Sequence, residues 1–245
     1  MKKITITQIS EKKIKAGNPL LQMEDFPNEL SFDEGELVEL VDSRQKFVAK
    51  AYLAKQNKGV GWVFSLDNAD SFNEAFFKKQ FEKAKRKRTD LQSDPETTTY
   101  RLFNAEGDGI PGVTIDHYDG FAVVSWYSEG IFRYQTAIIA AFQAVFPETK
   151  GIYEKFRYQR KDGLISRYVR GDAAPTPLIV KENGINYATY LDDGLMTGIF
   201  LDQRDVRGAL TERYAAGKRV LNTFSYTGAF SVAAAMGGAI ETTSV

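Results

Sequence analysis

The chain has 245 residues, of which 43% are hydrophobic and 26% charged, a composition typical of a globular protein with one large domain or a few small ones. Its 32 basic residues equal its 32 acidic residues, which excludes a uniformly basic nucleic-acid binder but leaves room for a local basic patch. There is no cysteine and one histidine, so disulfides, thiolate metal sites and a thiol nucleophile are excluded within the chain, and no metal site is expected.

The sequence shows no sign of a membrane segment or a secretion signal. No stretch approaches the ~20 apolar residues of a membrane span. The start at Met1–Thr7 carries cations but lacks the apolar region of a signal peptide. We therefore expect a cytoplasmic location.

Residues 1–72 have the pattern of a small β-barrel. Short segments rich in β-branched and aromatic residues alternate with turn residues. The expected strands are Ile4–Thr7, Leu37–Val41, Phe47–Leu53 and Val60–Phe64. The pattern fits any small all-β module, and on its own it implies no binding role.

A helix is expected next, because Phe77, Phe81 and Ala84 follow helical spacing and Ser71 and Glu74 have the spacing of a capping box. The helix ends in a basic run, residues 83–88, which suits the negative end of the helix dipole. Contact with phosphates is the alternative interpretation, and it assigns RNA binding to four residues: Lys83, Lys85, Arg86 and Arg88. Residues 91–96 are expected to form a loop.

The segment up to residue 190 predicts a compact α+β unit, so that residues 73–190 form a central domain with a leading helix. Its expected strands are Thr99–Asn104, Val113–His117, Phe121–Trp126, Gly151–Phe156, Ile179–Glu182 and Ile185–Tyr190. A helical stripe runs through Ile131, Tyr134, Ile138, Phe142 and Val145. Asn183-Gly184 is a strong signal for a type I′ hairpin between the last two strands.

Residues 191–245 predict the first half of a doubly wound fold, with a helix, a strand, a glycine-containing loop, a second helix and a second strand. The expected elements are Asp202–Tyr214, Arg219–Phe224, Ser225–Gly228, Ala229–Met236 and Ala239–Val245. The last strand would present an unpaired edge, which leaves a homodimer open.

The loop Asn222–Gly228 lies where a strand passes into a helix, so its backbone can approach a ligand closely. A dinucleotide fold would use G-x-G-x-x-G to admit a pyrophosphate, and here only Gly228 is present. A cofactor without phosphates, such as S-adenosylmethionine, needs fewer glycines. A purely structural strand–turn–helix explains the loop equally well.

Two other polar segments attract attention. In Thr197–Arg204, three polar side chains follow a glycine and apolar residues at a helix start, so the turn could face the cofactor's amino-acid end or RNA. Alternatively, Asp202 caps the helix and its neighbours are solvated. In Asn104–Asp116, acidic residues would repel phosphates, which favours a structural role. His117 is also interpreted as structural, because neighbours on a strand point to opposite faces.

Together these segments resemble one family, the bacterial rRNA large-subunit methyltransferase I family of 5-methylcytosine enzymes. The matching stretches are Arg101–Asp116, Lys181–Gly184 with Asp193-Gly194, Thr197–Arg204 and Val220–Gly238. The resemblance implies an N-terminal PUA-like RNA-binding barrel, a central small α+β domain, and a Rossmann-like methyltransferase domain that starts at residue 191. It therefore implies a multidomain α+β and α/β protein that acts on 23S rRNA.

The resemblance also implies site residues. Those assigned to S-adenosylmethionine are Phe200, Asp202, Gln203, Arg204, Asn222, Phe224, Ser225, Tyr226, Thr227 and Gly228. The sequence departs from the family at Ser225, where many members have cysteine, and at Leu195-Met196 and Asp205-Val206. These departures leave the cofactor assignment standing and weaken any RNA contact made by the turn.

The family's catalytic cysteine, its Asp-Pro-Pro motif and the ribose-binding carboxylate would all lie beyond Val245. Cytosine C5 is a poor nucleophile until a thiolate adds at C6. We therefore expect a truncated chain that is itself inactive, contains no catalytic residue and derives from a methyltransferase parent. An RNA-binding module without catalysis is the alternative, and a nicotinamide- or flavin-dependent oxidoreductase is the weakest hypothesis.

Overall fold

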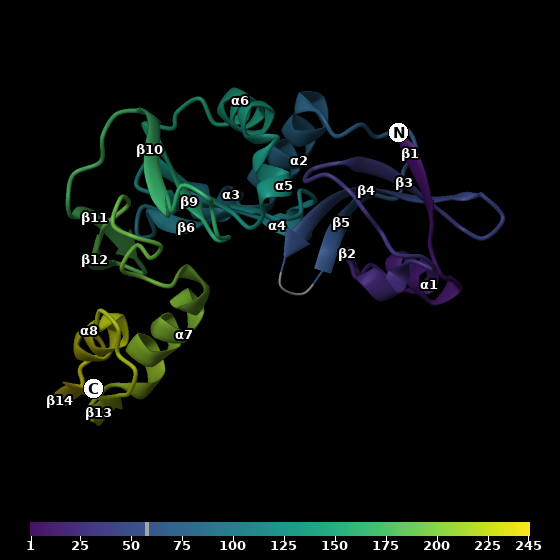
Figure 1. The fold of residues 1–245 in the computed structure, drawn as a ribbon. Coiled ribbons are helices and arrows are strands. Elements are labelled where there is room, and N and C mark those ends of the chain that lie inside the picture. The colour runs from purple at the N-terminus through teal and green to yellow at the C-terminus, as the bar shows by residue number, and fades with distance from the viewer. Residues whose placement is uncertain (57–58) are drawn as a thin grey trace.

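The computed structural model describes residues 1–56 and 59–245, and Figure 1 shows three consecutive parts along the chain. The N-terminal part is a mixed sheet in the order β1-β3-β4-β5-β2, in which β1 runs parallel to β3 and the other neighbours are antiparallel. Its strands are β1 (Lys2–Thr5), β2 (Leu20–Leu21), β3 (Leu37–Val41), β4 (Phe47–Gln56) and β5 (Gly59–Ser65).

The N-terminal part also contains helical elements that the sequence patterns did not indicate, α1 (Gln8–Lys15) and the 3₁₀ turn η1 (Met23–Asp25). The side chain of Thr7 caps α1 by accepting a hydrogen bond from the N–H of Ser10. Ile14 is the only buried apolar residue of α1, so the helix has no apolar stripe long enough to be recognised in the sequence.

Helix α2 (Glu74–Lys87) confirms the expected helix but corrects its cap. Asn73 is the N-cap, and its Oδ1 accepts a hydrogen bond from the N–H of Phe76 at 3.1 Å. The predicted capping box of Ser71 and Glu74 was therefore placed two residues too early. The loop expected at residues 91–96 was partly wrong, because α3 (Thr89–Ser93) continues the helical path.

The central part is a five-stranded sheet in the order β10-β9-β8-β7-β6, with only β8 and β9 parallel. Its strands are β6 (Thr99–Asn104), β7 (Val113–Tyr118), β8 (Phe121–Trp126), β9 (Gly151–Phe156) and β10 (Ser166–Gly171). Three helical elements complete it: α4 (Ala105–Asp108), α5 (Glu129–Phe132) and α6 (Gln135–Val145). The single stripe expected from Ile131 to Val145 is thus split between α5 and α6, and β10 was not predicted.

One apolar core joins the first two parts of the chain. Phe72 packs against Tyr52 of β4 and Phe77 of α2, with ring centroids 5.5 and 4.8 Å apart. The same core continues into the central sheet through Phe103 and Trp126. The two parts therefore meet across a continuous hydrophobic interior around residue 72.

The third part begins with the hairpin β11 (Leu178–Glu182) and β12 (Ile185–Thr189), where φ values of 51° at Asn183 and 77° at Gly184 confirm the predicted turn. It continues with elements that are well separated from β1–β5 in Figure 1. They are η2 (Leu201–Gln203), α7 (Arg204–Ala209), the π-helical turn η3 (Leu210–Tyr214), β13 (Arg219–Asn222), α8 (Ala229–Met236) and β14 (Glu241–Ser244). The parallel pairing of β13 with β14 around α8 agrees with the start of a doubly wound sheet.

Two large apolar side chains of the segment 202–214 do not pack against the rest of the chain. Val206 and Tyr214 are 55% and 66% exposed, whereas Arg207 and Ala215 are buried. Thr211 lies on the same side and donates a hydrogen bond to the carbonyl of Ala233 in α8. The helix therefore uses residues 207, 211 and 215, which follow i, i+4, i+8 spacing, to contact the rest of the chain.

No helix among the described residues is both long enough and apolar enough to cross a membrane.

Candidate functional site

The turn Thr197–Arg204 is held from behind by a buried ion pair. Arg207 of α7 donates hydrogen bonds to both carboxylate oxygens of Glu182 at 2.7 and 2.8 Å, and another to the carbonyl of Phe200 at 2.8 Å. Asn183, at the hairpin tip, donates a hydrogen bond to the carbonyl of Arg204. The hairpin β11–β12 thereby fixes the backbone at both ends of the segment 200–204.

The loop Asn222–Gly228 meets this turn directly. Thr227 donates a hydrogen bond from Oγ1 to the carbonyl of Gly198 at 2.6 Å. The rings of Phe200 and Tyr226 lie 5.3 Å apart. Two segments that the sequence analysis assigned to one cofactor site are therefore adjacent, and an aromatic pair lies between them.

The geometry of the loop fits a small ligand without phosphates. Its base is fixed because Asn222 donates a hydrogen bond to Ser231 of α8, whose hydroxyl also pairs with Ser244 of β14. Gly228 has a φ of 82°, and a Cβ built there would meet no atom within 4 Å, so the space beside the loop at this position is open. This open space lies next to the half-exposed rings of Phe200 and Tyr226.

Not all of the predicted cofactor residues face that space. Phe224 is 98% exposed, and Asn222 is engaged at the base of the loop. Arg204 pairs with its neighbour Asp205 at 3.1 Å. Asp202 makes no cap to α7, so the capping alternative is not observed; instead it lines a pocket against the central sheet.

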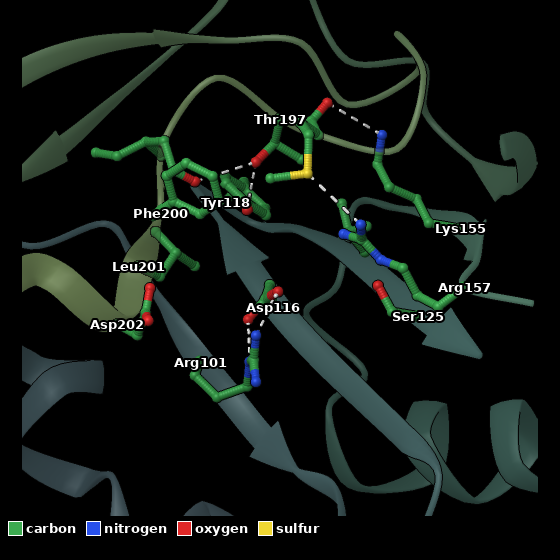
Figure 2. Close-up of a pocket in the computed structure, with 13 residues that line it drawn as sticks. Arg101, Asp116, Tyr118, Ser125, Lys155, Arg157, Thr197, Phe200, Leu201 and Asp202 are labelled. Atoms are coloured by element: carbon green, nitrogen blue, oxygen red, sulfur yellow. Dashed lines mark hydrogen bonds and ion pairs between the residues drawn. The ribbon is translucent and has the colours of Figure 1, made fainter. Parts of the chain in front are cut away.

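That pocket lies between the 196–202 turn and one face of the central sheet, as Figure 2 shows. Arg101 and Asp116 form a two-fold hydrogen-bonded pair at its floor. Burial raises the pKa of Asp116 despite the opposing charge of Arg101. Tyr118 donates to or accepts from Thr197 at 2.8 Å, which ties the turn to the sheet.

Most of this pocket was not predicted from the sequence. The polar residues that line the pocket on or next to the central sheet include Arg101, Asp116, Ser125, Lys155 and Arg157. The sequence did contain a pattern that could have indicated these residues, because side chains alternate between the two faces of a strand. Ile115, Val124 and Phe156 point into the apolar core, and the residues next to them supply the polar face. The second face is covered as well, because Val123 and Tyr153 on that side pack with apolar residues of the hairpin β11–β12.

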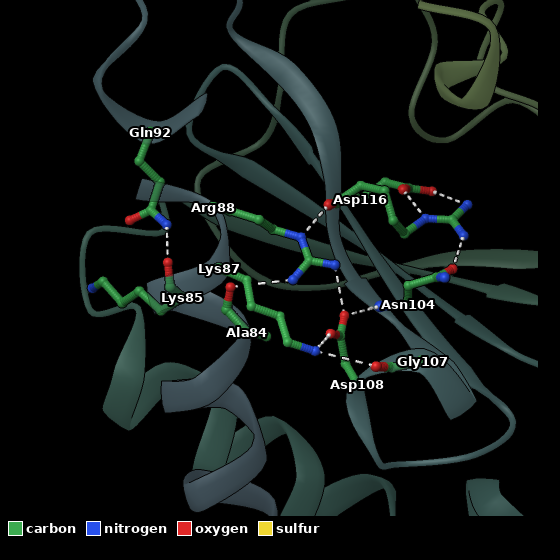
Figure 3. A network of polar contacts seen from close by, with 10 residues as sticks. Ala84, Lys85, Lys87, Arg88, Gln92, Asn104, Gly107, Asp108 and Asp116 are labelled. Carbon is green, nitrogen blue, oxygen red and sulfur yellow. Dashed lines mark hydrogen bonds and ion pairs between the residues drawn. The ribbon is translucent and has the colours of Figure 1, made fainter. Parts of the chain in front are cut away.

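The predicted RNA-binding cations at the end of α2 have different environments, and Figure 3 shows two of them, Lys85 and Arg88. Arg88 is largely buried and donates hydrogen bonds to Asp108, to the carbonyl of Arg101 and to the carbonyl of Ala84. Burial opposes ionisation of Asp108, but hydrogen bonds from Arg88 and Lys87 outweigh it and lower the pKa of this carboxyl. These contacts confirm the structural role predicted for the acidic residues of the 104–116 turn in the case of Asp108.

The other three cations are more accessible. Lys83 and Arg86 are exposed. Lys85 donates a hydrogen bond to the carbonyl of Val145 at 2.8 Å and lies over the ring of Phe146. Lys83 and Arg86 are therefore the more accessible cations, although the Lys83 ammonium also donates a hydrogen bond to Gln80 at 3.3 Å.

His117 has a structural environment, as predicted. Its Nε2 accepts a hydrogen bond from the N–H of Gly120, and its ring stacks on Tyr100 at 5.0 Å. Burial lowers the pKa of His117 to about 4, which keeps the ring neutral at physiological pH.

Two segments of the chain match models of known protein families. Residues 4–66 match the profile of a PUA-like domain, and residues 132–245 match that of an S-adenosylmethionine-dependent methyltransferase. The chain therefore combines a segment similar to PUA-like domains with a segment similar to S-adenosylmethionine-dependent methyltransferases. The expected fold class, with a PUA-like module followed by a methyltransferase domain, is confirmed.

Two curated relatives of the chain have names that refer to the methylation of ribosomal RNA. The chain is 47% identical over 249 residues to a Bacillus subtilis protein provisionally named ribosomal RNA large subunit methyltransferase YwbD, covering 100% of this chain and 63% of that protein. It is 37% identical over 215 residues to ribosomal RNA large subunit methyltransferase I of Cronobacter sakazakii, covering 86% of this chain and 54% of that protein. The chain thus spans between about half and two thirds of the length of these curated relatives.

Solved structures agree with this assignment. A Streptococcus mutans protein, provisionally described as a SAM-dependent methyltransferase, superposes with a TM-score of 0.93 at 48% identity, covering 100% of this chain and 63% of that chain. SMU.776, provisionally described as a methyltransferase and solved in complex with SAH, also has a TM-score of 0.93 at 48% identity, covering all of this chain and 62% of its own.

Proposed function

We propose that the full-length gene product transfers a methyl group from S-adenosylmethionine to C5 of a cytosine in 23S rRNA. The observation that carries this proposal is the contact between the turn Thr197–Arg204 and the loop Asn222–Gly228, through Thr227 and the Phe200–Tyr226 pair. Two sequence motifs of one family meet in space beside an open loop, and relatives named for large-subunit rRNA extend the proposal to the substrate.

In this proposal the cofactor lies between the 200–204 turn and the 222–228 loop. When bound, S-adenosylmethionine supplies the methyl group. Phe200 and Tyr226 offer aromatic surface for the adenine, and Thr227 holds the two segments together. The Gly228 N–H donates to the carbonyl of Ser225, so the first N–H groups of α8 that follow it are the ones proposed to meet the polar part of the cofactor.

RNA would be held by the PUA-like part and by exposed cations elsewhere. Of the four cations predicted at the end of α2, we retain Lys83 and Arg86 as direct phosphate contacts and Lys85 as a partial one. Arg88 is engaged in the protein's own hydrogen bonds, so its role in the proposal is to shape the end of α2. A homodimer and a cytoplasmic location stay predictions.

The test is a methyl-transfer assay with the full-length gene product, S-adenosylmethionine labelled in its methyl group, and 23S rRNA transcribed in vitro. Nucleoside analysis by mass spectrometry should find the label in 5-methylcytidine. Label in another nucleoside would overturn the cytosine-C5 assignment while leaving the methyltransferase assignment standing. Tight RNA binding without transfer of label would favour the RNA-binding module instead.

A further inference from the structure

Two cations of the central sheet are left without an acidic partner. Among residues 1–56 and 59–245, the Arg157 guanidinium forms no salt bridge, and its side chain contacts Met196 Sδ at 3.5 Å. The Lys155 ammonium donates hydrogen bonds to two carbonyls, of Gly194 at 2.6 Å and of Met196 at 3.4 Å. Lys155 is fully buried, so its charge is an unusual feature of the fold.

Both cations line the pocket against the central sheet, and Figure 2 shows them on the same side of it. Lys155 lies in β9 directly opposite Ser125 of β8, whose side chain lines the same pocket. An ammonium has three donors, and the two carbonyls accept two of them. The buried Lys155 therefore contributes positive charge at the back of the pocket, and the exposed Arg157 has N–H groups that a ligand can reach at the mouth.

The arrangement has an electrostatic cost that an anion would relieve. Burial, followed by the nearby charge of Arg157, lowers the pKa of Lys155 to about 8. The other arginine of the pocket, Arg101, is already neutralised by Asp116. A free negative group is therefore attracted to the end of the pocket where Lys155 and Arg157 lie, and not to the end occupied by Arg101.

We propose that Arg157 binds a backbone phosphate of single-stranded RNA next to the nucleotide that is methylated, while the buried Lys155 behind it adds positive charge without direct contact. The pocket shares the residues Phe200–Asp202 with the cofactor turn, so a phosphate held there leaves the adjoining nucleotide beside the proposed cofactor. This inference rests on the proposed function and adds the site that holds the substrate strand. Arginine suits the task because its planar donors match phosphate oxygens.

Two other anions could bind in the same pocket, the carboxylate of the cofactor's methionine moiety and free phosphate, because both are negatively charged. RNA is favoured because Arg157 is exposed at the mouth of the pocket. A long chain can pass across such a mouth, whereas a small anion gains nothing from an open mouth.

The experiment measures RNA binding by the full-length gene product and by its Arg157→Gln variant, using a short fluorescent single-stranded RNA over a series of salt concentrations. We expect binding about tenfold weaker at low salt. The slope of log K against log salt should also decrease in magnitude by about 0.7, which is the loss of one phosphate contact to a single strand. Arg157→Lys should recover part of the affinity.

Arg170→Gln is the matched control, because Arg170 is an exposed arginine on the neighbouring strand β10 and lies outside the pocket. It should leave both affinity and slope unchanged. Titrations with S-adenosylhomocysteine and with inorganic phosphate complete the design. S-adenosylhomocysteine should bind Arg157→Gln and the unmodified protein alike, whereas inorganic phosphate should bind Arg157→Gln more weakly, in parallel with RNA.

The proposal is overturned if Arg157→Gln has the RNA affinity and salt slope of Arg170→Gln. It is also overturned if Arg157→Gln weakens S-adenosylhomocysteine or inorganic phosphate while RNA binding is retained, since the pocket then serves the cofactor's carboxylate or a free anion. Failure of the proposed function gives a different result: no methyl transfer by the unmodified protein, with the effect of Arg157→Gln on RNA binding intact.

Discussion

Arg207 and Glu182 form a two-fold hydrogen-bonded ion pair with side chains that are only 2% and 1% exposed. One partner belongs to the helix after the cofactor turn and the other to the hairpin β11–β12. Because Arg207 also donates to the carbonyl of Phe200, the pair connects this hairpin with the proposed cofactor site. The position of the turn therefore depends on the hairpin.

Breaking this pair should destabilise the protein strongly. We expect Glu182→Ala to lower the free energy of unfolding by about 3–5 kcal/mol, because it leaves the Arg207 charge buried without its partner. The control is Glu241→Ala, which removes an exposed pair with Arg219 and should cost about 0–1 kcal/mol. Denaturant unfolding measures both, and equal costs for the two variants would contradict the role assigned to Glu182.

The contact between turn and loop should matter for the cofactor more than for folding. Thr227→Val removes the hydroxyl that donates to Gly198 and keeps the shape of the side chain. We expect about threefold to tenfold weaker binding of S-adenosylhomocysteine, which corresponds to the loss of one hydrogen bond. Thr223→Val, at an exposed position of the same loop, is the control and should bind normally. The contact is dispensable if both variants bind alike.

Periodicity and motifs predicted the parts of this molecule that carry long apolar patterns or distinctive turns. Strands such as Phe121–Trp126 and helix Ala229–Met236 were placed at their observed bounds, because burial on a sheet or small-residue packing leaves a clear local pattern. Helix α1 was missed because Ile14 is its only buried apolar residue.

The site was predictable only where it is local in sequence. The turn at 197–204 and the loop at 222–228 are continuous segments, and their motifs identified them. Lys155 and Arg157 join them only through the pairing of β8 with β9, and the burial of Arg207 depends on Glu182 some 25 residues away. Contacts of this kind are set by tertiary packing, which a single sequence does not display.

His117 should make stability depend on pH below neutrality. Its pKa is about 4 in the folded protein and about 6.5 when unfolded, so the folded state resists protonation. Its contribution to stability is complete above pH 6.5 and is lost as the pH falls toward 4. His117→Gln should flatten the dependence of the unfolding free energy on pH across this window. As the chain has one histidine, the difference between the two profiles reports this residue alone. Parallel profiles would show that its burial has no such effect.

The aromatic core around Phe72 should make the N-terminal and central parts unfold together. Phe72 is 5% exposed and contacts rings from both parts. We expect Phe72→Ala to cost about 3–5 kcal/mol while the transition remains single. Phe47→Ala, at a partly exposed position of β4, is the control and should cost less. Two separate transitions in the unmodified protein, followed by near- and far-ultraviolet circular dichroism, would contradict a shared core.

The central claim is that the turn Thr197–Arg204 and the loop Asn222–Gly228 form one S-adenosylmethionine site. Isothermal titration of S-adenosylhomocysteine into the full-length gene product tests it most directly, with Phe200→Ala and Tyr226→Ala measured alongside. The account predicts saturable binding at one site per chain, weakened by both substitutions while stability is retained. Absence of binding to the unmodified, folded protein, or binding that neither substitution changes, would contradict it.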